Sequence, residues 1–167
     1  GSTGVTTKHA LLASSAGLEV GDFGHIFLNG VDVAPNQRGY NLVAVHPDST
    51  LNMMQASFDT HISPEASQRM QDFIAEVPDG WIVAGAAADE ASLNLSEETA
   101  QVLQSLGIVE SLRGRFRWSH AFIGVKGATP GTALASLDET RPAHVFVGLP
   151  LSEPRLAAAL TEFALCP

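Results

Sequence analysis

The run Trp81–Ala88, WIVAGAAA, constrains the fold most, because almost no polar side chain interrupts it. A strand with one face in water alternates apolar and polar residues, whereas a strand covered on both faces is apolar throughout. The run is also far shorter than the ~18 apolar residues of a membrane-spanning helix. The chain must therefore supply enough other structure to cover both faces of this strand.

Short apolar stretches bounded by turn residues predict further strands on both sides of this run. Asn29-Gly30 is a strong signal for a tight turn, since both residues tolerate positive φ angles. The early strands are joined by turns, so we expect them to pair in antiparallel fashion. The predicted strands cover residues 11–16, 25–28, 31–33, 40–45, 53–58, 81–88, 121–126 and 144–149.

Helical patterns alternate with the later strands. Ser63-Pro64 is a typical helix start, and apolar residues then recur at helical spacing up to Val77. Ser96 caps a second predicted helix, supported by Glu98 or Thr99, and a third is expected over 152–165. Strands first, then helices between buried strands, indicate a mixed α/β (α+β) fold: a mixed sheet, or a sandwich of sheets flanked by helices.

Length and composition favour one soluble domain. The 167 residues are 45% hydrophobic and 16% charged, which is enough to build a core without disulfides or metals. We assign residues 9–167 to a single domain and residues 1–8 to a tag remnant or flexible N-terminus, because Gly1-Ser2 is typical of cloning. The chain would then be a fragment of a larger parent protein, whose other domains are expected partners.

Charge and cysteine content exclude several function classes. The net charge is −9, whereas nucleic acids and anionic membranes attract basic surfaces, so neither is an expected partner. The single cysteine, Cys166, cannot form a disulfide within the chain.

No motif for metal binding or catalysis is present. His46 and Asp48, and Asp59 and His61, follow strands but lack a zinc-site pattern, so we expect hydrogen bonds in loops there. There is no Gly-x-Ser-x-Gly elbow, and the glycines form no phosphate-binding loop. The sequence therefore predicts no catalytic residue, no metal and no cofactor.

Three polar segments at strand ends are candidates for binding instead. They are the segment that begins with Arg38, the acidic pair Asp89-Glu90, and the aromatic and basic segment 115–120. Arginine donors, carboxylate acceptors and a flat aromatic ring together suit a polyhydroxylated ligand. The alternative is a structural Arg–Asp pair with Trp118 packed at the edge of the sheet.

Several short motifs in one order also resemble a known family, the interleukin-like EMT-inducer (ILEI) domain, also called the GG domain. The resemblance covers about residues 11–127. The segments that carry it are Leu28-Asn29-Gly30, RGYNLV at 38–43, FDTH at 58–61, PDGWIV at 78–83, DEAS at 89–92, LQSLG at 103–107 and AFIGVKG at 121–127.

The resemblance implies a sandwich of two β-sheets with flanking helices, an extracellular or cell-surface location, and lectin-like carbohydrate binding. In one relative, the stem domain of an O-mannose-linked N-acetylglucosaminyltransferase, the domain binds glycans of the N-acetylglucosamine type. Its sugar-binding motifs fall on Arg38, Asp89 and Arg117 of this chain. Trp118 beside them, or Phe116, could stack on the sugar.

The sequence departs from the family pattern at two positions in the last motif. His120 replaces the expected tryptophan, and Trp118 replaces an expected aspartate, so the preferred glycan could differ. The four cysteines typical of the cytokine-like members are absent as well. Two alternatives to a sugar-binding module remain: a cytokine-like protein-interaction domain, and an enzyme that uses Asp89 and Glu90 with a nearby histidine.

Overall fold

Strand β6 (Ile82–Asp89) lies at the centre of the fold, as its apolar sequence requires. In the computed structural model, which describes residues 4–148, β6 is hydrogen-bonded to β4, β7 and β1. Seven of its eight residues are buried, and only Asp89 is half-buried. The prediction of a strand covered on both faces is confirmed.

The nine strands form one hydrogen-bonded sheet with two branches that meet at β6. The larger branch runs β5-β4-β6-β7-β8 and the smaller β3-β2-β1-β9; they are joined where β1 and β6 pair in parallel at two positions. The other strands are β1 (Leu11–Gly17), β2 (Phe23–Leu28), β3 (Val31–Asp32), β4 (Gly39–His46), β5 (Ser49–Phe58), β7 (Ser119–Val125), β8 (Leu134–Asp138) and β9 (Ala143–Val147).

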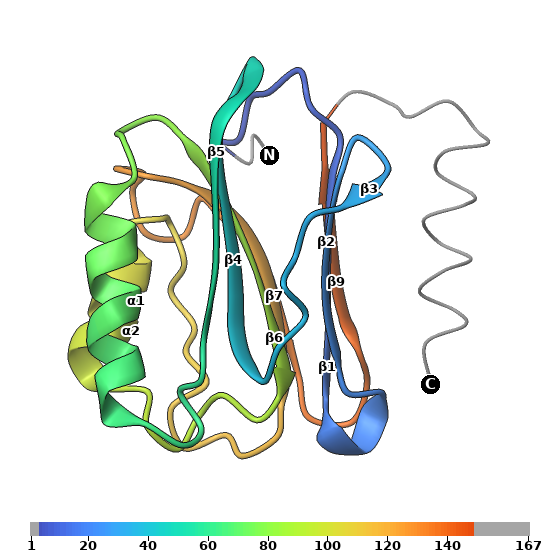
Figure 1. Ribbon diagram of the computed structural model, residues 1–167, viewed down its shortest axis with the longest axis vertical. Helices are drawn as coiled ribbons and strands as arrows, with labels where there is room; N and C mark the ends of the chain where they lie inside the picture. Colours follow the sequence, from blue (N-terminus) through green and yellow to red (C-terminus); the bar gives the residue numbers. More distant parts are fainter. Residues whose placement is uncertain (1–3, 149–167) are drawn as a thin grey trace.

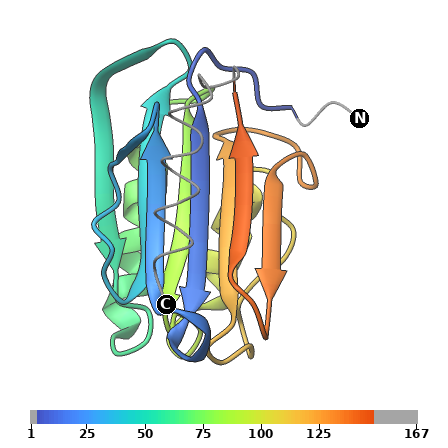
Figure 2. The same cartoon turned by 90° about the vertical axis from the view of Figure 1, so that its right-hand side faces the viewer.

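The two branches and the helices form successive layers (Figure 1). Helices α1 (Pro64–Glu76) and α2 (Glu97–Gln104) cover the outer face of the larger branch. Strands β1, β2 and β9 lie on its other side and face the viewer in Figure 2. A short 3-10 helix, η1 (Leu18–Val20), follows β1 at the end of the sheet where β6 terminates.

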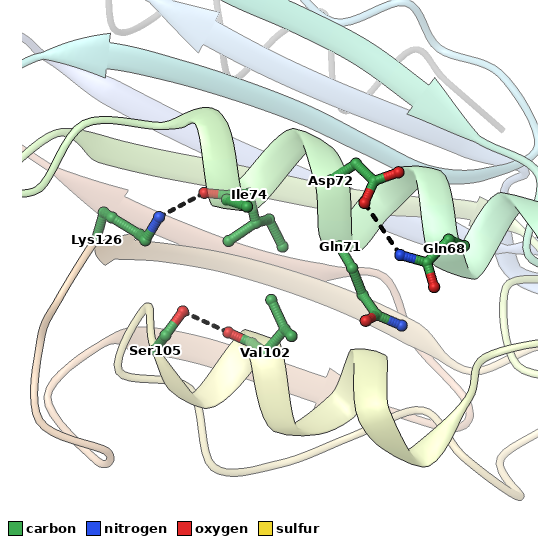
Figure 3. A pocket seen from close by; sticks show the side chains of 8 residues that line it. Gln68, Gln71, Asp72, Ile74, Val102, Ser105 and Lys126 are labelled. Atoms are coloured by element: carbon green, nitrogen blue, oxygen red, sulfur yellow. Dashed lines mark hydrogen bonds between the residues drawn. The ribbon is translucent and has the colours of Figure 1, made fainter.

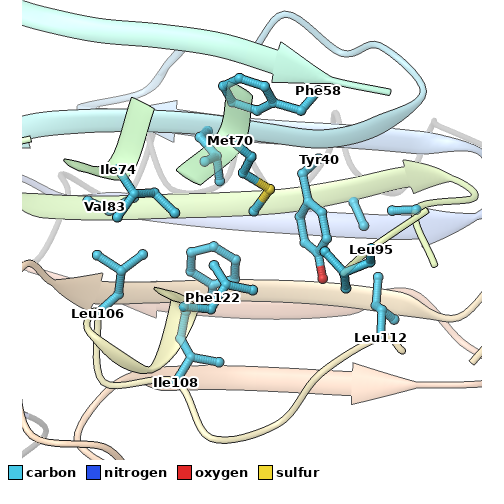
Figure 4. Packing of buried hydrophobic residues seen from close by; sticks show 14 of the residues in the cluster. Tyr40, Phe58, Met70, Ile74, Val83, Leu95, Leu106, Ile108, Leu112 and Phe122 are labelled. Carbon is cyan, nitrogen blue, oxygen red and sulfur yellow. The ribbon is translucent and has the colours of Figure 1, made fainter. Parts of the chain in front are cut away.

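Alternate residues of β6 contribute to two different cores, which explains why the strand has no polar face. Val83 and Ala87 belong to the core under the helices, together with Tyr40, Met70 and Phe122 (Figure 4). Ile82, Ala84 and Ala86 belong to the core between the branches; its other large members are Leu11, Ile26, Leu28, Val43, Val45 and Ile123. At about 25 cal/mol per Å² of buried apolar surface, these cores dominate the stabilisation of the fold.

The helix and turn signals of the sequence are confirmed. Pro64 opens α1, the side chain of Ser96 accepts a hydrogen bond from the backbone of Thr99, and Asn29-Gly30 closes the β2–β3 hairpin with positive φ angles. The mixed α/β class and the antiparallel pairing of β1 with β2 and β4 with β5 are confirmed too.

Other features were not predicted. Strand β8 was missed, and η1 occupies a segment that was expected to be only a break between strands. The parallel contact of β1 with β6 joins the described strands in one network. The residue patterns had left a mixed sheet or a sandwich open, and the family resemblance implied two separate sheets. The helix expected over 152–165 lies outside the described residues. Within residues 4–148, no helix is both long and apolar enough to cross a membrane.

Candidate functional site

The three candidate segments meet at one end of the sheet, around the carboxyl end of β6. Asp89 is the last residue of β6 and pairs with Gly17 at the end of β1. Gly39, which follows Arg38, pairs with Ala88 on the other side of β6. The loop that leads into β7 approaches from the third side, where the backbone N–H of Arg117 lies 3.5 Å from a carboxylate oxygen of Glu90.

Arg38 forms a two-pronged ion pair with Asp59. Its Nε lies 3.1 and 3.0 Å from the two carboxylate oxygens, and its Nη2 lies 2.7 Å from one of them. Gly39 makes this approach possible, because its φ is +95° and a Cβ there would meet the carbonyl oxygen of Phe58 at 2.0 Å. Arg38 therefore pairs with Asp59, which the sequence did not single out for this role.

Glu90 is the buried centre of the site. Only 1% of the residue is exposed. Its carboxylate accepts hydrogen bonds from the hydroxyl and backbone N–H of Ser92, the backbone N–H of Leu93 and the Nδ1 of His61. Burial alone would raise the pKa of Glu90, but these hydrogen bonds outweigh it and lower that pKa. An ionised carboxylate thus ties together the turn after β5, the loop after β6 and the loop before β7.

The histidine on this carboxylate reaches the surface. His61 Nδ1 lies 2.8 Å from Glu90 Oε2, and 28% of the His61 side chain is exposed. Because a carboxylate accepts, Nδ1 donates, and the ring orientation is held by a buried group. The expectation that His46 and His61 form hydrogen bonds in loops is confirmed, since His46 Nδ1 also accepts from the backbone of Asp48.

Asp89 contributes negative charge beside Arg38. It is half-buried, and its φ of +60° is unusual for a residue other than glycine. Partial burial, followed by the charge of Asp89, raises the pKa of Asp22, so these two carboxylates lie within electrostatic range. Hydrogen bonding to Asp59 raises the pKa of Arg38, and the charges of Asp89 and Glu90 act in the same direction.

Arg117 is held in a strained conformation at the other side of the site. Its φ is +63°, its Nη1 lies 3.0 Å from Glu19 Oε1, and its guanidinium carbon lies 4.8 Å from the centre of the Phe116 ring. Among the described residues, its buried Nε has no hydrogen-bond partner. Such backbone strain is typical of functional sites.

The side chain of Trp118 is packed against the core and does not project freely from the surface. The side chain is half-buried against the core under the helices, and the guanidinium carbon of Arg115 lies 5.1 Å from the centre of its ring. Phe116 is the more open ring, with 48% of the residue exposed.

Behind the surface residues lies a fully buried polar chain. The hydroxyl of Tyr40 lies 2.8 Å from Nδ1 of His120, and the backbone N–H of His120 donates to Ser15. Burial, followed by the charge of Arg115, lowers the pKa of His120 to about 4. The residue at the expected tryptophan position is therefore a neutral core histidine, and it does not reach the surface.

A separate groove of about 250 Å³ lies between α1 and α2 (Figure 3). Among the described lining residues its only cation is Lys126, which donates to the carbonyl oxygens of Ile74 and Val77 at 2.6 and 3.1 Å. This lysine stabilises the C-terminal end of α1. Nowhere in residues 4–148 do three or more histidine, cysteine or acidic side chains form a group that could hold a metal ion.

The structure thus brings Arg38, Asp89 and Arg117 to the same end of the sheet, with Trp118 packed beneath Arg115. Sequence reasoning missed the central role of Glu90, and its alternative of a structural Arg–Asp pair did not name Asp59 as the partner of Arg38. Glu90 and Asp59 both lie in motifs that resemble the ILEI domain, DEAS and FDTH, so the sequence did mark these two residues as candidates. Their roles depended on contacts between distant segments.

Comparison with known proteins places the sequence in a family. Residues 38–128 match the family model described as interleukin-like EMT inducer. The chain is 32% identical over 128 residues to a cell surface hyaluronidase of Danio rerio, in an alignment that covers 75% of this chain and 9% of that protein. It is 33% identical over 90 residues to a human cell migration-inducing and hyaluronan-binding protein, covering 54% of this chain and 7% of that protein.

The mouse protein of the same name is 37% identical over 92 residues, which cover 53% of this chain and 7% of the relative. The chain therefore spans less than a tenth of the length of these relatives.

Proposed function

The chain belongs to the interleukin-like EMT inducer family, and from this premise we propose that it is a lectin-like, carbohydrate-binding module. The proposed site is formed by Arg38, Asp89 and Arg117, with Phe116 or Trp118 as an aromatic neighbour. Two relatives are named hyaluronan-binding proteins, which supports a glycan as the ligand.

One observation carries the proposal: three segments far apart in the sequence present their motif residues around one buried carboxylate. The Glu90 carboxylate accepts hydrogen bonds from His61, Ser92 and Leu93. Its Oε1 also lies 3.5 Å from the backbone nitrogen of Arg117. A preorganised set of donors and acceptors lowers the entropic cost of binding a small polar ligand. Such a set suits the hydroxyls and N-acetyl group of a sugar.

The charge of the site favours a neutral sugar. Arg38 is paired with Asp59 and Arg117 with Glu19, so each arginine already faces a carboxylate of this chain. Asp22, Asp89 and Glu90 add further negative charge. An added uronate would meet repulsion, so we propose a neutral N-acetylglucosamine unit as the recognised sugar.

We further propose that the module has no catalytic activity. Paired carboxylates that hydrolyse glycosides must both reach the substrate. Glu90 is buried, and its oxygens are used by Ser92, Leu93 and His61. That leaves Asp89 without the second reactive carboxylate of the alternative enzyme hypothesis.

We also propose a domain organisation and a location for the chain. Residues 9–167 would form one domain of a larger cell-surface or extracellular protein, in line with the names of the relatives. The two branches of the sheet would correspond to the two sheets of the ILEI sandwich.

A glycan array tests the proposal. The parent chain, displayed in several copies so that weak sites act together, should give signals on glycans that end in N-acetylglucosamine or contain it. The triple variant Arg38→Ala, Asp89→Ala, Arg117→Ala should lose these signals. The control triple Arg69→Ala, Asp72→Ala, Arg141→Ala removes the same charges at exposed positions and should keep them.

Two outcomes would reject the proposal. Equal glycan signals from the parent chain and the site triple would place the sugar elsewhere. Silence of the parent chain across the array, together with saturable binding to a protein receptor, would favour the cytokine-like alternative.

A further inference from the structure

The opposite end of β6 carries a second surface of a different kind. Trp81 directly precedes β6, and the β4–β5 hairpin turns beside it. Here lies a groove of about 220 Å³, lined by His46, Ser49, Leu51, Asn52 and Trp81. None of these residues belongs to the site at the carboxyl end of β6.

The groove combines apolar surface with hydrogen-bonding groups, of which the hydroxyl of Ser49 also accepts from the backbone N–H of Leu51 at 3.1 Å. Trp81 is half-buried, and 72% of Leu51 is exposed. The ring of His46 meets that of Trp81 edge-on, with their centres 6.0 Å apart. The amide of the exposed Asn52 lies on the same lining. Of the residues that the structure describes, no acidic side chain, lysine or arginine lines the groove, although the chain carries a net charge of −9.

The ring of His46 is oriented by its own turn. Its Nδ1 accepts a hydrogen bond from the backbone N–H of Asp48 at 3.1 Å, so the neutral ring carries its proton on Nε2. The segment before β1 holds the backbone of this turn, because Nε2 of His9 lies 3.0 Å from the carbonyl oxygen of His46. Thr7 and Lys8 both donate to the carbonyl oxygen of Pro47. The groove is therefore a preorganised one.

We infer that this groove is a second carbohydrate-binding subsite, which takes one neutral pyranose ring. The C–H face of the sugar packs on Trp81 and Leu51, while its hydroxyls reach the Nε2–H of His46, the hydroxyl of Ser49 and the amide of Asn52. The uncharged lining selects a neutral ligand. The choice of a sugar among neutral ligands rests on the proposed function of the chain.

The two sites are physically separate. Trp81 directly precedes β6 and Asp89 is its last residue, eight positions further along, which at ~3.3 Å per residue places them about 25 Å apart. A chain with two weak sugar sites binds a polysaccharide more tightly than a short oligosaccharide, because the second contact forms at a high effective concentration.

The two tryptophans of the chain, Trp81 and Trp118, give each site its own probe. The two indole N–H signals are assigned in ¹⁵N-labelled protein with Trp81→Phe and Trp118→Phe. Tri-N-acetylchitotriose and cellotriose are then titrated in. We expect the Trp81 signal to shift in a saturable manner, and to do so equally in the Arg38→Ala, Arg117→Ala variant.

Asn52 allows a mild loss-of-contact variant. Its φ is +59°, so Asn52→Gly keeps the backbone conformation while removing the amide. Loss of one hydrogen bond should weaken the affinity read from the Trp81 signal by about threefold to tenfold. Val109→Ala, which shortens an exposed aliphatic side chain outside both sites, should leave that affinity unchanged.

The possible outcomes separate the two proposals. If the indole signal of Trp118 shifts on titration and that of Trp81 does not, the second subsite is overturned and the first site is not. A moving Trp81 signal with no shift around Arg38, Asp89 and Arg117 supports the second subsite and overturns the first. If neither region responds to either sugar, both proposals fail.

Discussion

The Nδ1 atom of His61 lies 2.8 Å from a carboxylate oxygen of Glu90, which links an exposed imidazole to a buried charge. The same carboxylate accepts from the backbone of Ser92 and Leu93. Glu90 thereby holds together loops that the sequence separates by about thirty residues on either side. We regard this carboxylate as the structural basis of the proposed sugar site.

Replacing Glu90 by glutamine should destabilise the protein and weaken glycan binding together. In the Glu90→Gln variant, the side-chain amide nitrogen would face N–H and O–H donors that now point at a carboxylate oxygen. We expect this to lower the free energy of unfolding by about 1–3 kcal/mol. Urea denaturation followed by far-UV circular dichroism measures this cost. Glu110→Gln, at an exposed position, should be neutral, and equal stability of the two variants would contradict the role assigned to Glu90.

A methyl group on Gly17 should displace the Arg117 loop. A Cβ at Gly17 would lie 1.8 Å from the carbonyl oxygen of Arg117, so the backbone must shift. We expect Gly17→Ala to cost about 1–3 kcal/mol, as overpacking generally does, and to change the amide chemical shifts of residues 115–118.

Gly80→Asn is the matched control for this substitution. Gly80 also lies near the end of a strand, two residues before β6 begins, but nothing lies within 4 Å of its Cβ position. Asparagine adopts positive φ angles more readily than most residues, so Gly80→Asn adds backbone strain at φ +85° without a steric clash, and it should leave the shifts of residues 115–118 unchanged. Similar effects of the two substitutions would show that the contact between Gly17 and Arg117 does not position the loop.

Acid should destabilise the fold through His120. Its pKa is about 4 in the folded chain, below the ordinary value of 6.5, so the unfolded state binds the extra proton between these values. Stability is therefore full above pH 6.5 and falls by about 3 kcal/mol as the pH drops to 4. Urea titrations across this range should show a shallower decline for His120→Gln, and identical pH slopes would contradict the assignment.

Ionic strength should have little effect on glycan affinity. Both arginines are paired with carboxylates, so a neutral sugar gains no net charge attraction that salt could screen. Affinity for tri-N-acetylchitotriose, measured by calorimetry, should stay constant between about 0.02 M and 0.5 M NaCl. A steep loss of affinity with salt would indicate recognition of an anionic sugar instead.

Much of the fold followed from the sequence because it depends on local patterns. The apolar run of β6, the Pro64 and Ser96 helix starts and the Asn29-Gly30 turn all carry their signal within a few residues. Strand β8 was missed because its sequence, LASLD, is short and half-buried, without the branched residues typical of strands.

The site was less predictable, because it depends on contacts between distant segments. Arg38 and Asp59 are 21 residues apart, and His61 and Glu90 are 29 apart. Local sequence marks such residues as polar groups at strand ends, but it does not indicate which of them pair. The burial of His120 beside Tyr40 was likewise unforeseen, since histidine in a motif usually suggests an exposed functional group.

The most direct test of the central claim is an NMR titration of ¹⁵N-labelled protein with tri-N-acetylchitotriose. Saturable amide shifts should cluster around Arg38, Asp89 and Arg117, and should vanish there in the Arg38→Ala, Arg117→Ala variant while its melting temperature stays close to that of the parent chain. Shifts that leave these three positions unchanged, or that persist around them in the double variant, would contradict the proposed site.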